Sequence, residues 1–92
     1  MTESILQKEK RCYICGSALN LERHHIMSGT ANRKLSERFG LVVWLCMDHH
    51  RGRIGVHTYY ILNERLRRDA QLAFEAEYGH KMWMQTFRKN YV

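Results

Sequence analysis

Two short cysteine motifs constrain the fold of this chain more than any other feature. Cys12 and Cys15 form a C-x-x-C motif, and Cys46 and His49 form a C-x-x-H motif further along the chain. Zinc takes four nitrogen or sulfur ligands in a tetrahedron, and an x-x spacing lets one turn present two of them. We therefore expect these four side chains to hold one structural zinc ion. Such a site joins an N-terminal knuckle to the start of a helix, an arrangement known as a treble clef.

The alternative to a zinc site is three buried cysteines and histidines satisfied by hydrogen bonds. Three is an odd number of cysteines, which argues against a closed disulfide framework. A single C-x-x-C arises by chance more readily than two matched half-sites in one small domain. A zinc ion with four protein ligands has a structural role rather than a catalytic one, and its binding contributes to folding.

The length of the chain, 92 residues, fits one domain. A domain of this size buries a modest core and often depends on a metal or a disulfide. Hydrophobic residues make up 45% of the chain, which is enough for a folded protein. The chain has no apolar run near the ~18 residues of a membrane helix, and its first residues do not resemble a signal peptide. We expect a protein of the cytoplasm of its host cell.

Apolar and polar patterning predicts a small α+β domain. Residues 1–10 are expected to form a loose lead-in, 11–57 the zinc-containing core, and 58–92 C-terminal helices. The expected elements are strands at 21–26 and 41–46, a short helix at about 32–39, a helix from about Asp48, a long helix from Thr58 or Asn63 to Tyr78, and a final short helix.

Glycines are expected to end two of the helices, and apolar side chains indicate which helix faces are buried. Gly40 and Gly79 are expected to stop the helices that precede them. The long helix should bury one amphipathic stripe. Its members are Leu62, Leu66, Ala70, Ala73 and Glu77, flanked by Leu72 and Phe74, while Met82, Trp83 and Phe87 should face inward from the last helix.

Four of the six histidines form two adjacent pairs, His24–His25 and His49–His50. Neighbouring residues point about 100° apart on a helix and to opposite faces of a strand. Each pair should therefore serve two places. The simplest arrangement combines one histidine of each pair in a second, open metal site, and leaves the other histidine of the first pair to act as a base.

The order and spacing of these motifs resemble a known family. "C-x-x-C … HHI … LC-x-x-HH" is similar to the treble-clef branch of the HNH endonucleases, also called His-Me finger or ββα-metal nucleases. The resemblance extends from Cys12 to about His57. The chain also looks like small nuclease-like proteins of phages and prophages of Gram-positive bacteria, through "GTANRKLSE", "GVH" and the terminal "KNY".

The resemblance implies a role for each remaining histidine. His24 takes the place of a metal ligand, His25 that of the general base that deprotonates the attacking water, and His50 that of the closing metal ligand. His57, in "GVH", has no settled counterpart. It is a candidate for a further ligand or a phosphate contact, and a structural role is an equal alternative.

These residue types suit phosphodiester hydrolysis. An imidazole with an ordinary pKa of ~6.5 is an effective base near neutral pH. A divalent cation stabilises the charge that develops on the phosphate and the leaving oxygen. Because imidazole is a softer ligand than carboxylate, Mn²⁺, Ni²⁺ or Zn²⁺ are as suitable as Mg²⁺ for this catalytic position.

The chain departs from the family pattern at one position. The family has an asparagine before the second strand, where it ties down the loop, whereas this chain has Gly40 and Leu41 in "FGLVVWLC". Asn32 lies upstream at a different spacing.

A net charge of +6 favours a polyanionic partner such as nucleic acid, with a merely basic protein as the alternative. Arg65, Arg67 and Arg68 are expected on a solvated face of the long helix, and Trp44 and Trp83 in the core. The side chains that flank the expected metal site, and are therefore candidates for phosphate contacts, are Arg33, Lys34, Arg38, Arg51 and Arg53.

The expected function is a metal-dependent HNH-type endonuclease that acts on DNA and derives from a phage. A non-catalytic module of the same fold is the main alternative, binding DNA or a phage recombination or packaging partner. A zinc-stabilised protein-interaction domain is a third. A second copy of the chain or a larger phage protein is an expected partner where both strands are cut.

Overall fold

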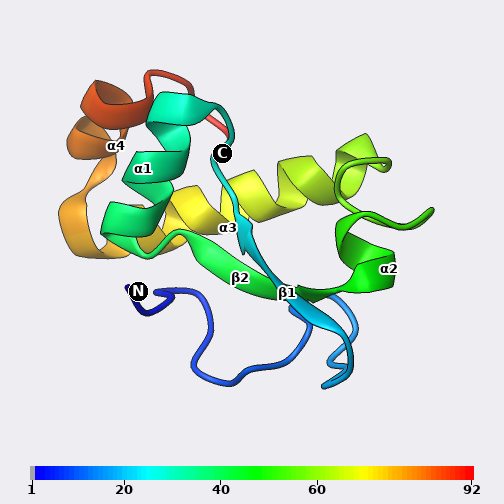
Figure 1. Ribbon diagram of the computed structural model, residues 1–92. Coiled ribbons are helices and arrows are strands. Elements are labelled where there is room, and N and C mark those ends of the chain that lie inside the picture. The colour runs from blue at the N-terminus through cyan, green and yellow to red at the C-terminus, as the bar shows by residue number, and fades with distance from the viewer. Residues whose placement is uncertain (1) are drawn as a thin grey trace.

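The computed structural model describes residues 2–92, and these form a small α+β domain as expected. Two antiparallel strands pair near the middle of the structure, with the N-terminal segment on one side of them and most of the helices on the other (Figure 1). The elements in chain order are β1 (Leu21–His25), α1 (Thr30–Phe39), β2 (Val42–Cys46), α2 (Met47–His50), α3 (Tyr60–Tyr78) and α4 (His80–Phe87).

The register of the β1–β2 hairpin determines which side chains share a face. Leu21 pairs with Cys46 at one end, and His25 pairs with Val42 at the other. Side chains alternate between faces along a strand. Glu22 and His24 therefore lie on one face of β1, while Arg23 and His25 lie on the other.

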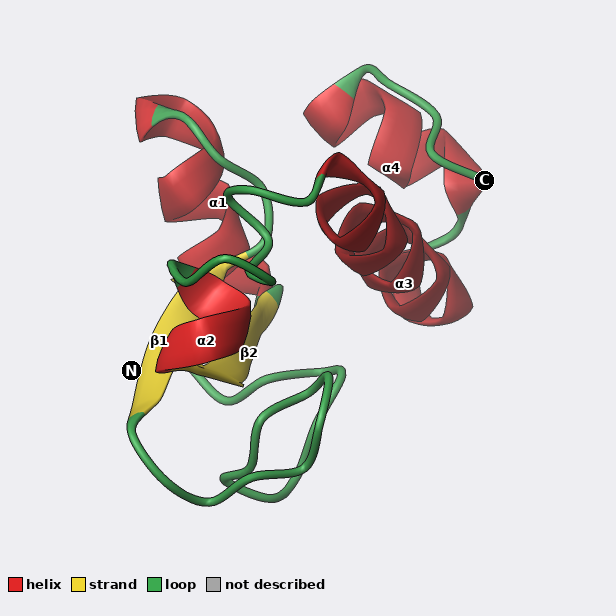
Figure 2. Ribbon diagram, turned by 90° about the vertical axis from the view of Figure 1, so that its right-hand side faces the viewer, coloured by secondary structure: helices red, strands yellow, loops and turns green. Residues whose placement is uncertain are grey.

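The core lies between the hairpin and the two C-terminal helices. Leu41, Val43 and Leu45 are almost completely buried, as are Leu66 and Phe74 of α3. The Phe74 ring contacts Trp83 of α4 and Phe39 of α1, with centroid distances of 5.4 and 5.1 Å. Figure 2 shows α3 and α4 side by side, so α4 covers one side of the long helix. Burial of this apolar surface is the main favourable contribution to folding.

The start of α3 differs from the expected one. The helix begins at Tyr60 with Tyr59 as its N-cap residue, so neither Thr58 nor Asn63 caps it. Thr58 lies in the preceding loop, where its hydroxyl donates a hydrogen bond to the carbonyl of Gly52 at 3.1 Å. Asn63 is inside the first turn. Hydrogen bonds within the loop therefore outweigh the local capping preference.

The apolar face of the C-terminal helices is narrower than expected. Leu66, Ala70 and Phe74 are buried, but Leu72, which was expected beside the apolar stripe, is exposed. Met82 is also exposed, contrary to prediction, whereas Met84 packs against the core. The space near α4 is instead filled by the C-terminal segment. The buried Gln71 of α3 holds this segment: its amide N–H donates to the side-chain oxygen of Asn90 at 2.7 Å, and its amide oxygen accepts from the Tyr91 N–H at 2.6 Å.

Residues 2–10, expected as a loose lead-in, form no helix or strand but contact the sheet. The backbone N–H of Ile5 donates to the carbonyl of Gly40 at 2.9 Å, and the side chain of Gln7 accepts from the N–H of Trp44 at 2.6 Å. Gly40 follows the last residue of α1 and has φ 71°. The backbone oxygen of Glu3 lies where a Cβ of residue 40 would be. The glycine is therefore required for both the turn and this close approach. Among the described residues, no helix is long and apolar enough to cross a membrane.

Candidate functional site: two metal-ligand clusters

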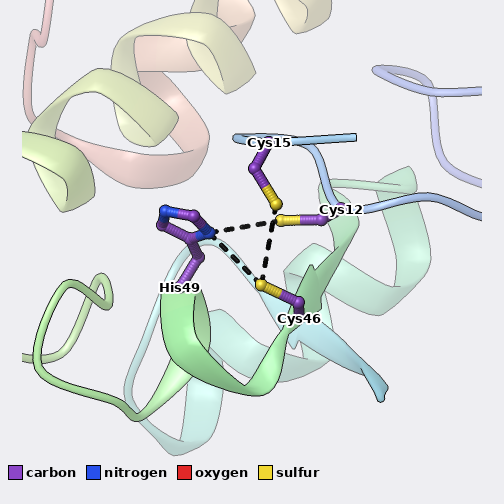
Figure 3. Close-up of side chains that lie close together, drawn as sticks. All are labelled: Cys12, Cys15, Cys46 and His49. Carbon is purple, nitrogen blue, oxygen red and sulfur yellow. Dashed lines mark hydrogen bonds between the residues drawn. The ribbon is translucent and has the colours of Figure 1, made fainter. Parts of the chain in front are cut away.

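The first cluster contains the four side chains of the two cysteine motifs. Figure 3 shows Cys12, Cys15, Cys46 and His49 converging on one point from the knuckle and from the start of α2. Their sulfur and nitrogen atoms all lie within 4.8 Å of one another. A Cys₃His cluster of this kind is the ligand set of a structural zinc site.

The distances within this cluster fit one tetrahedral ion. Zinc–sulfur bonds of about 2.3 Å place two sulfurs roughly 3.8 Å apart. Cys15 Sγ and Cys46 Sγ are 3.8 Å apart, and His49 Nδ1 lies 3.8 Å from Cys12 Sγ and 3.2 Å from Cys46 Sγ. Disulfide bonds are much shorter, at about 2.05 Å. The three cysteines are free thiols.

Local backbone structure explains how each half-site is formed. Gly16 has φ 79° and closes the turn of the knuckle by donating from its N–H to the carbonyl of Cys12 at 2.8 Å. Tyr13 N–H donates to the Trp44 carbonyl at 2.8 Å and attaches the knuckle to β2. Cys46 ends β2 and is the N-cap residue of α2, so His49 follows it on the first turn of that helix.

The ionisation of the thiols is also consistent with a cation at their centre. Burial opposes ionisation of Cys12, but backbone N–H groups outweigh it and lower the pKa of this thiol to about 6. Burial raises the pKa of Cys46, a backbone hydrogen bond from His49 opposes this, and the neighbouring Cys12 and Cys15 thiols raise the pKa further. Three adjacent thiolates repel one another unless a cation compensates them, and metal binding displaces the thiol protons.

The second cluster consists of His24 from β1, His50 from α2 and His57 from the loop before α3. One ring nitrogen from each lies within 4.8 Å of the others. The ring centroids are separated by 5.1 Å for His24–His50, 5.4 Å for His24–His57 and 4.9 Å for His50–His57. Three imidazoles from three separate segments therefore converge on one small volume.

His24 is the buried member of this cluster. Burial, and then the nearby His50 and His57, lower its pKa to about 3, so it is neutral at physiological pH. Its Nε2 is buried and has no hydrogen-bond partner. Among the side-chain nitrogens and oxygens of residues 2–92, only Nε of Arg67 is in the same situation. A buried polar atom without a partner is costly. A neutral imidazole with a free nitrogen is the form that binds a metal ion.

His50 is oriented by a carboxylate. Its Nδ1 lies 2.9 Å from Oε1 of Glu22, and the other oxygen of Glu22 pairs with Arg51 at 2.9 Å. Metal-binding histidines commonly donate their second N–H to a carboxylate, which fixes the ring and its tautomer. This arrangement leaves Nε2 of His50 free to bind a metal ion. The hydrogen bond to His50, with burial opposing it, lowers the pKa of Glu22.

The sequence left open whether His57 joins the metal site, and the structure places its ring in the cluster. The loop folds back on α2, since Val56 N–H donates to the His49 carbonyl at 2.9 Å. Gly52 and Gly55 pack closely against α2, and a Cβ at either position would collide with the backbone of that helix. The loop can follow this path only because both residues lack a side chain.

His25 lies on the opposite face of β1 from His24, as the alternation predicts. Its Nε2 is 2.9 Å from Oε2 of Glu37 in α1, and Arg23 also pairs with this carboxylate. Both histidines nevertheless line the same pocket. That pocket has a volume of about 410 Å³, and its lining includes His50, His57 and Arg33. Glu37 is a functional candidate that sequence patterning missed, because its partner is distant in the chain.

A buried serine ties down the loop between β1 and α1, a role that the sequence resemblance led us to expect of an asparagine. Ser36 is completely buried, and its hydroxyl accepts from the Met27 N–H at 3.0 Å and donates to the Met27 carbonyl at 3.1 Å. The N–H of Ile26 also donates to the carbonyl of Leu41 at 3.0 Å. The loop is therefore held without the asparagine, and Asn32 is not the residue that holds it.

Only some of the residues expected to contact phosphate lie at this pocket. Arg33 lines it, and Arg51 is connected to it through Glu22. Lys34, Arg38 and Arg53 are exposed but are not part of its lining.

Two other expectations about basic and aromatic residues need correction. Arg67 is not on a solvated face: its side chain is 19% exposed and it donates to Ser28 at 3.2 Å and pairs with Glu64 at 3.4 Å. Trp83 is in the core, but Trp44 is only partly buried, with the Lys10 ammonium 4.5 Å from its ring centroid. Arg65 and Arg68 are exposed as expected.

Comparison with known proteins adds no family to these observations. No family model matches the chain, and neither a curated protein nor a solved structure matches it at a significant level.

Proposed function

We propose that this chain is a metal-dependent HNH-type endonuclease that hydrolyses phosphodiester bonds in DNA and derives from a phage. One observation carries the proposal: the three-histidine cluster of His24, His50 and His57 borders the same pocket as His25. A candidate metal position and a candidate base beside one concave surface are the components that metal-assisted hydrolysis requires.

The zinc cluster and the histidine cluster have different tasks in this proposal. Four protein ligands leave no open position on a tetrahedral ion, so the Cys₃His site holds the knuckle, β2 and α2 together. Three imidazoles leave room for substrate oxygen or water on an ion with more than three coordination positions. A divalent ion there would stabilise the charge on the phosphate and on the leaving oxygen.

The residues of the chain supply the remaining steps. His25 accepts the proton of the attacking water, a role for which its place in the pocket suits it. Arg33 at the same pocket binds a phosphate of the DNA backbone. The overall charge of +6 attracts DNA and makes its binding sensitive to salt.

The ligand type indicates which ions to test. Imidazole nitrogen suits Mn²⁺, Ni²⁺ and Zn²⁺, whereas Mg²⁺ favours oxygen ligands. Three neutral imidazoles also contribute no negative charge to offset that of the ion. We expect transition metals to support cleavage at lower concentrations than Mg²⁺.

The experiment is plasmid nicking by purified, zinc-loaded protein. Supercoiled DNA is incubated with Mg²⁺, Mn²⁺, Ni²⁺ or Zn²⁺, and the wild type is compared with His25→Ala. His80→Ala is the matched control, because His80 is also paired with a glutamate but lies at the start of α4. Nicking that is lost in His25→Ala and kept in His80→Ala, with both variants folded, supports the nuclease.

The same experiment distinguishes the main alternative. Salt-sensitive DNA binding without nicking in any of these metals would support a non-catalytic, zinc-stabilised module that binds DNA during phage recombination or packaging. Absence of both binding and nicking would leave a protein-interaction domain as the better account.

A further inference from the structure

We propose that Glu37 is a positioning residue for His25, holding its ring so that Nδ1 is the nitrogen that accepts the proton. The proposal rests on the nuclease function above and adds a second residue of α1, besides Arg33, to the site. The family resemblance assigned no role to Glu37.

The contacts of Glu37 fix its carboxylate firmly. Its Oε2 lies 2.9 Å from Nε2 of His25 and also receives the guanidinium of Arg23, while its Oε1 accepts from the Thr2 N–H at 3.2 Å. Arg23 in turn donates to the Thr2 carbonyl at 2.6 Å. A carboxylate with three donors from two other segments has little freedom to rotate.

The ring of His25 is constrained by this fixed acceptor. An ionised carboxylate only accepts hydrogen bonds, so the Nε2 that lies 2.9 Å from it carries the proton. A guanidinium nitrogen of Arg23 is also near this Nε2, but at the longer distance of 3.5 Å. The neutral ring then has its lone pair on Nδ1. No hydrogen bond to Nδ1 of His25 occurs within residues 2–92, and His25 lines the pocket, so the proposal assigns this nitrogen to the attacking water.

The position of Glu37 in the fold explains why it can reach His25. The buried Ser36 fixes the loop to α1, and Glu37 is the next residue of that helix. The side chains of His25 and Glu37 are 19% and 34% exposed, so the hydrogen bond between them is partly shielded from water. Oriented bases of this kind lose activity when the orienting partner is removed.

The test compares Glu37→Gln and Glu37→Ala with the wild type. Glutamine keeps an oxygen that accepts the His25 N–H, whereas alanine does not. Glu75→Ala is the matched control, since Glu75 accepts from His80 at 2.9 Å on another part of the molecule. Initial nicking rates are measured over a range of plasmid concentrations, and ring nitrogens of His25 are assigned by ¹H–¹⁵N correlation NMR.

We expect Glu37→Ala to lower kcat by about 10- to 100-fold with little change in KM. Glu37→Gln should restore most of kcat, and Glu75→Ala should leave it unchanged. In the spectra, His25 should be the Nε2–H tautomer in the wild type and in Glu37→Gln, and a mixture of tautomers in Glu37→Ala.

The two proposals fail in different ways. A wild type that cleaves no DNA refutes the nuclease, while a wild-type His25 with its proton on Nδ1 refutes the role of Glu37 whatever the activity. A wild type that nicks DNA, with an equally active Glu37→Ala or with a Glu37→Gln as slow as Glu37→Ala, also overturns the positioning role.

Discussion

His49 and His50 are consecutive residues of α2, yet their rings belong to two different clusters. Nδ1 of His49 lies 3.2 Å from Cys46 Sγ, whereas the His50 ring centroid is 5.1 Å from that of His24. The turn of about 100° between successive helical residues accounts for this separation. A helix of four residues therefore links a site that stabilises the fold to a site that is proposed to cut DNA.

The first prediction distinguishes the roles of His49 and His50. His49→Ala should lose zinc and unfold, because it removes one of four ligands of the structural ion. His50→Ala should retain about one zinc per chain and a folded circular dichroism spectrum but lose nicking activity. Elemental analysis, thermal melting and the plasmid assay measure the three outcomes. Unfolding of both variants would contradict the division of tasks.

The second prediction concerns the contribution of zinc to folding. Wild-type protein should contain about one tightly bound zinc ion per chain, and a strong chelator should unfold it. Cys46→Ser should be unfolded, since structural zinc binding is worth roughly 10 kcal/mol or more. Ser17→Ala on the same knuckle is a control that keeps all four ligands. Retention of a cooperative melt after complete removal of zinc would refute this account.

The third prediction tests Ser36 as the residue that holds the β1–α1 loop. Ser36→Ala should lower the free energy of unfolding by about 1–3 kcal/mol, because the buried Met27 backbone loses both hydrogen bonds to the hydroxyl. Denaturant titration of zinc-loaded protein measures the change. Ser28→Ala, at an exposed position of the same loop, should have a smaller effect. Equal stability of Ser36→Ala and the wild type would show that the loop does not depend on this hydroxyl.

The Cys₃His cluster and the strands could be predicted because their signals are local. The x-x spacing of each half-site and the apolar, β-branched run at 42–46 are visible in a few consecutive residues. Alternation along β1 also predicted that His24 and His25 face different ways. In each case the local geometry alone determines the answer.

The partners of the histidines could not be predicted, because they are polar contacts between distant segments. Glu22 meets His50, and Glu37 meets His25, through the register of the hairpin and the placement of α1. No periodicity marks such acids in a sequence. The inward position expected for Met82 was wrong for a similar reason, since the C-terminal segment packs on Trp83 instead, where the indole N–H donates to the Lys89 carbonyl at 2.8 Å.

The fourth prediction follows from the hydrogen bond between Tyr13 and Asp69, which links the zinc knuckle to α3 at 2.9 Å. Burial, and then Asp69, raise the pKa of Tyr13 from 10 to about 12. The neutral phenol is thus favoured in the folded state, so its contribution is complete below pH 10 and is lost as the pH rises towards 12. Tyr13→Phe should cost about 1 kcal/mol at neutral pH.

Denaturant titrations between pH 8 and 12 compare Tyr13→Phe with the wild type. The difference in stability between the two proteins should shrink above pH 10. Tyr59→Phe is the control, because Tyr59 is half exposed in the loop before α3. A difference that stays constant up to pH 12 would show that the Tyr13 hydroxyl does not titrate with folding.

The central claim is that His24, His50 and His57 form a metal site separate from the zinc cluster. Titration of zinc-loaded protein with Ni²⁺ or Co²⁺, followed by calorimetry and visible absorption, tests it most directly. The wild type should bind one further ion per chain, and His24→Ala should bind it at least 10-fold more weakly while keeping its zinc. A zinc-loaded wild type that binds no second ion, or a His24→Ala variant that binds it equally well, would contradict the claim.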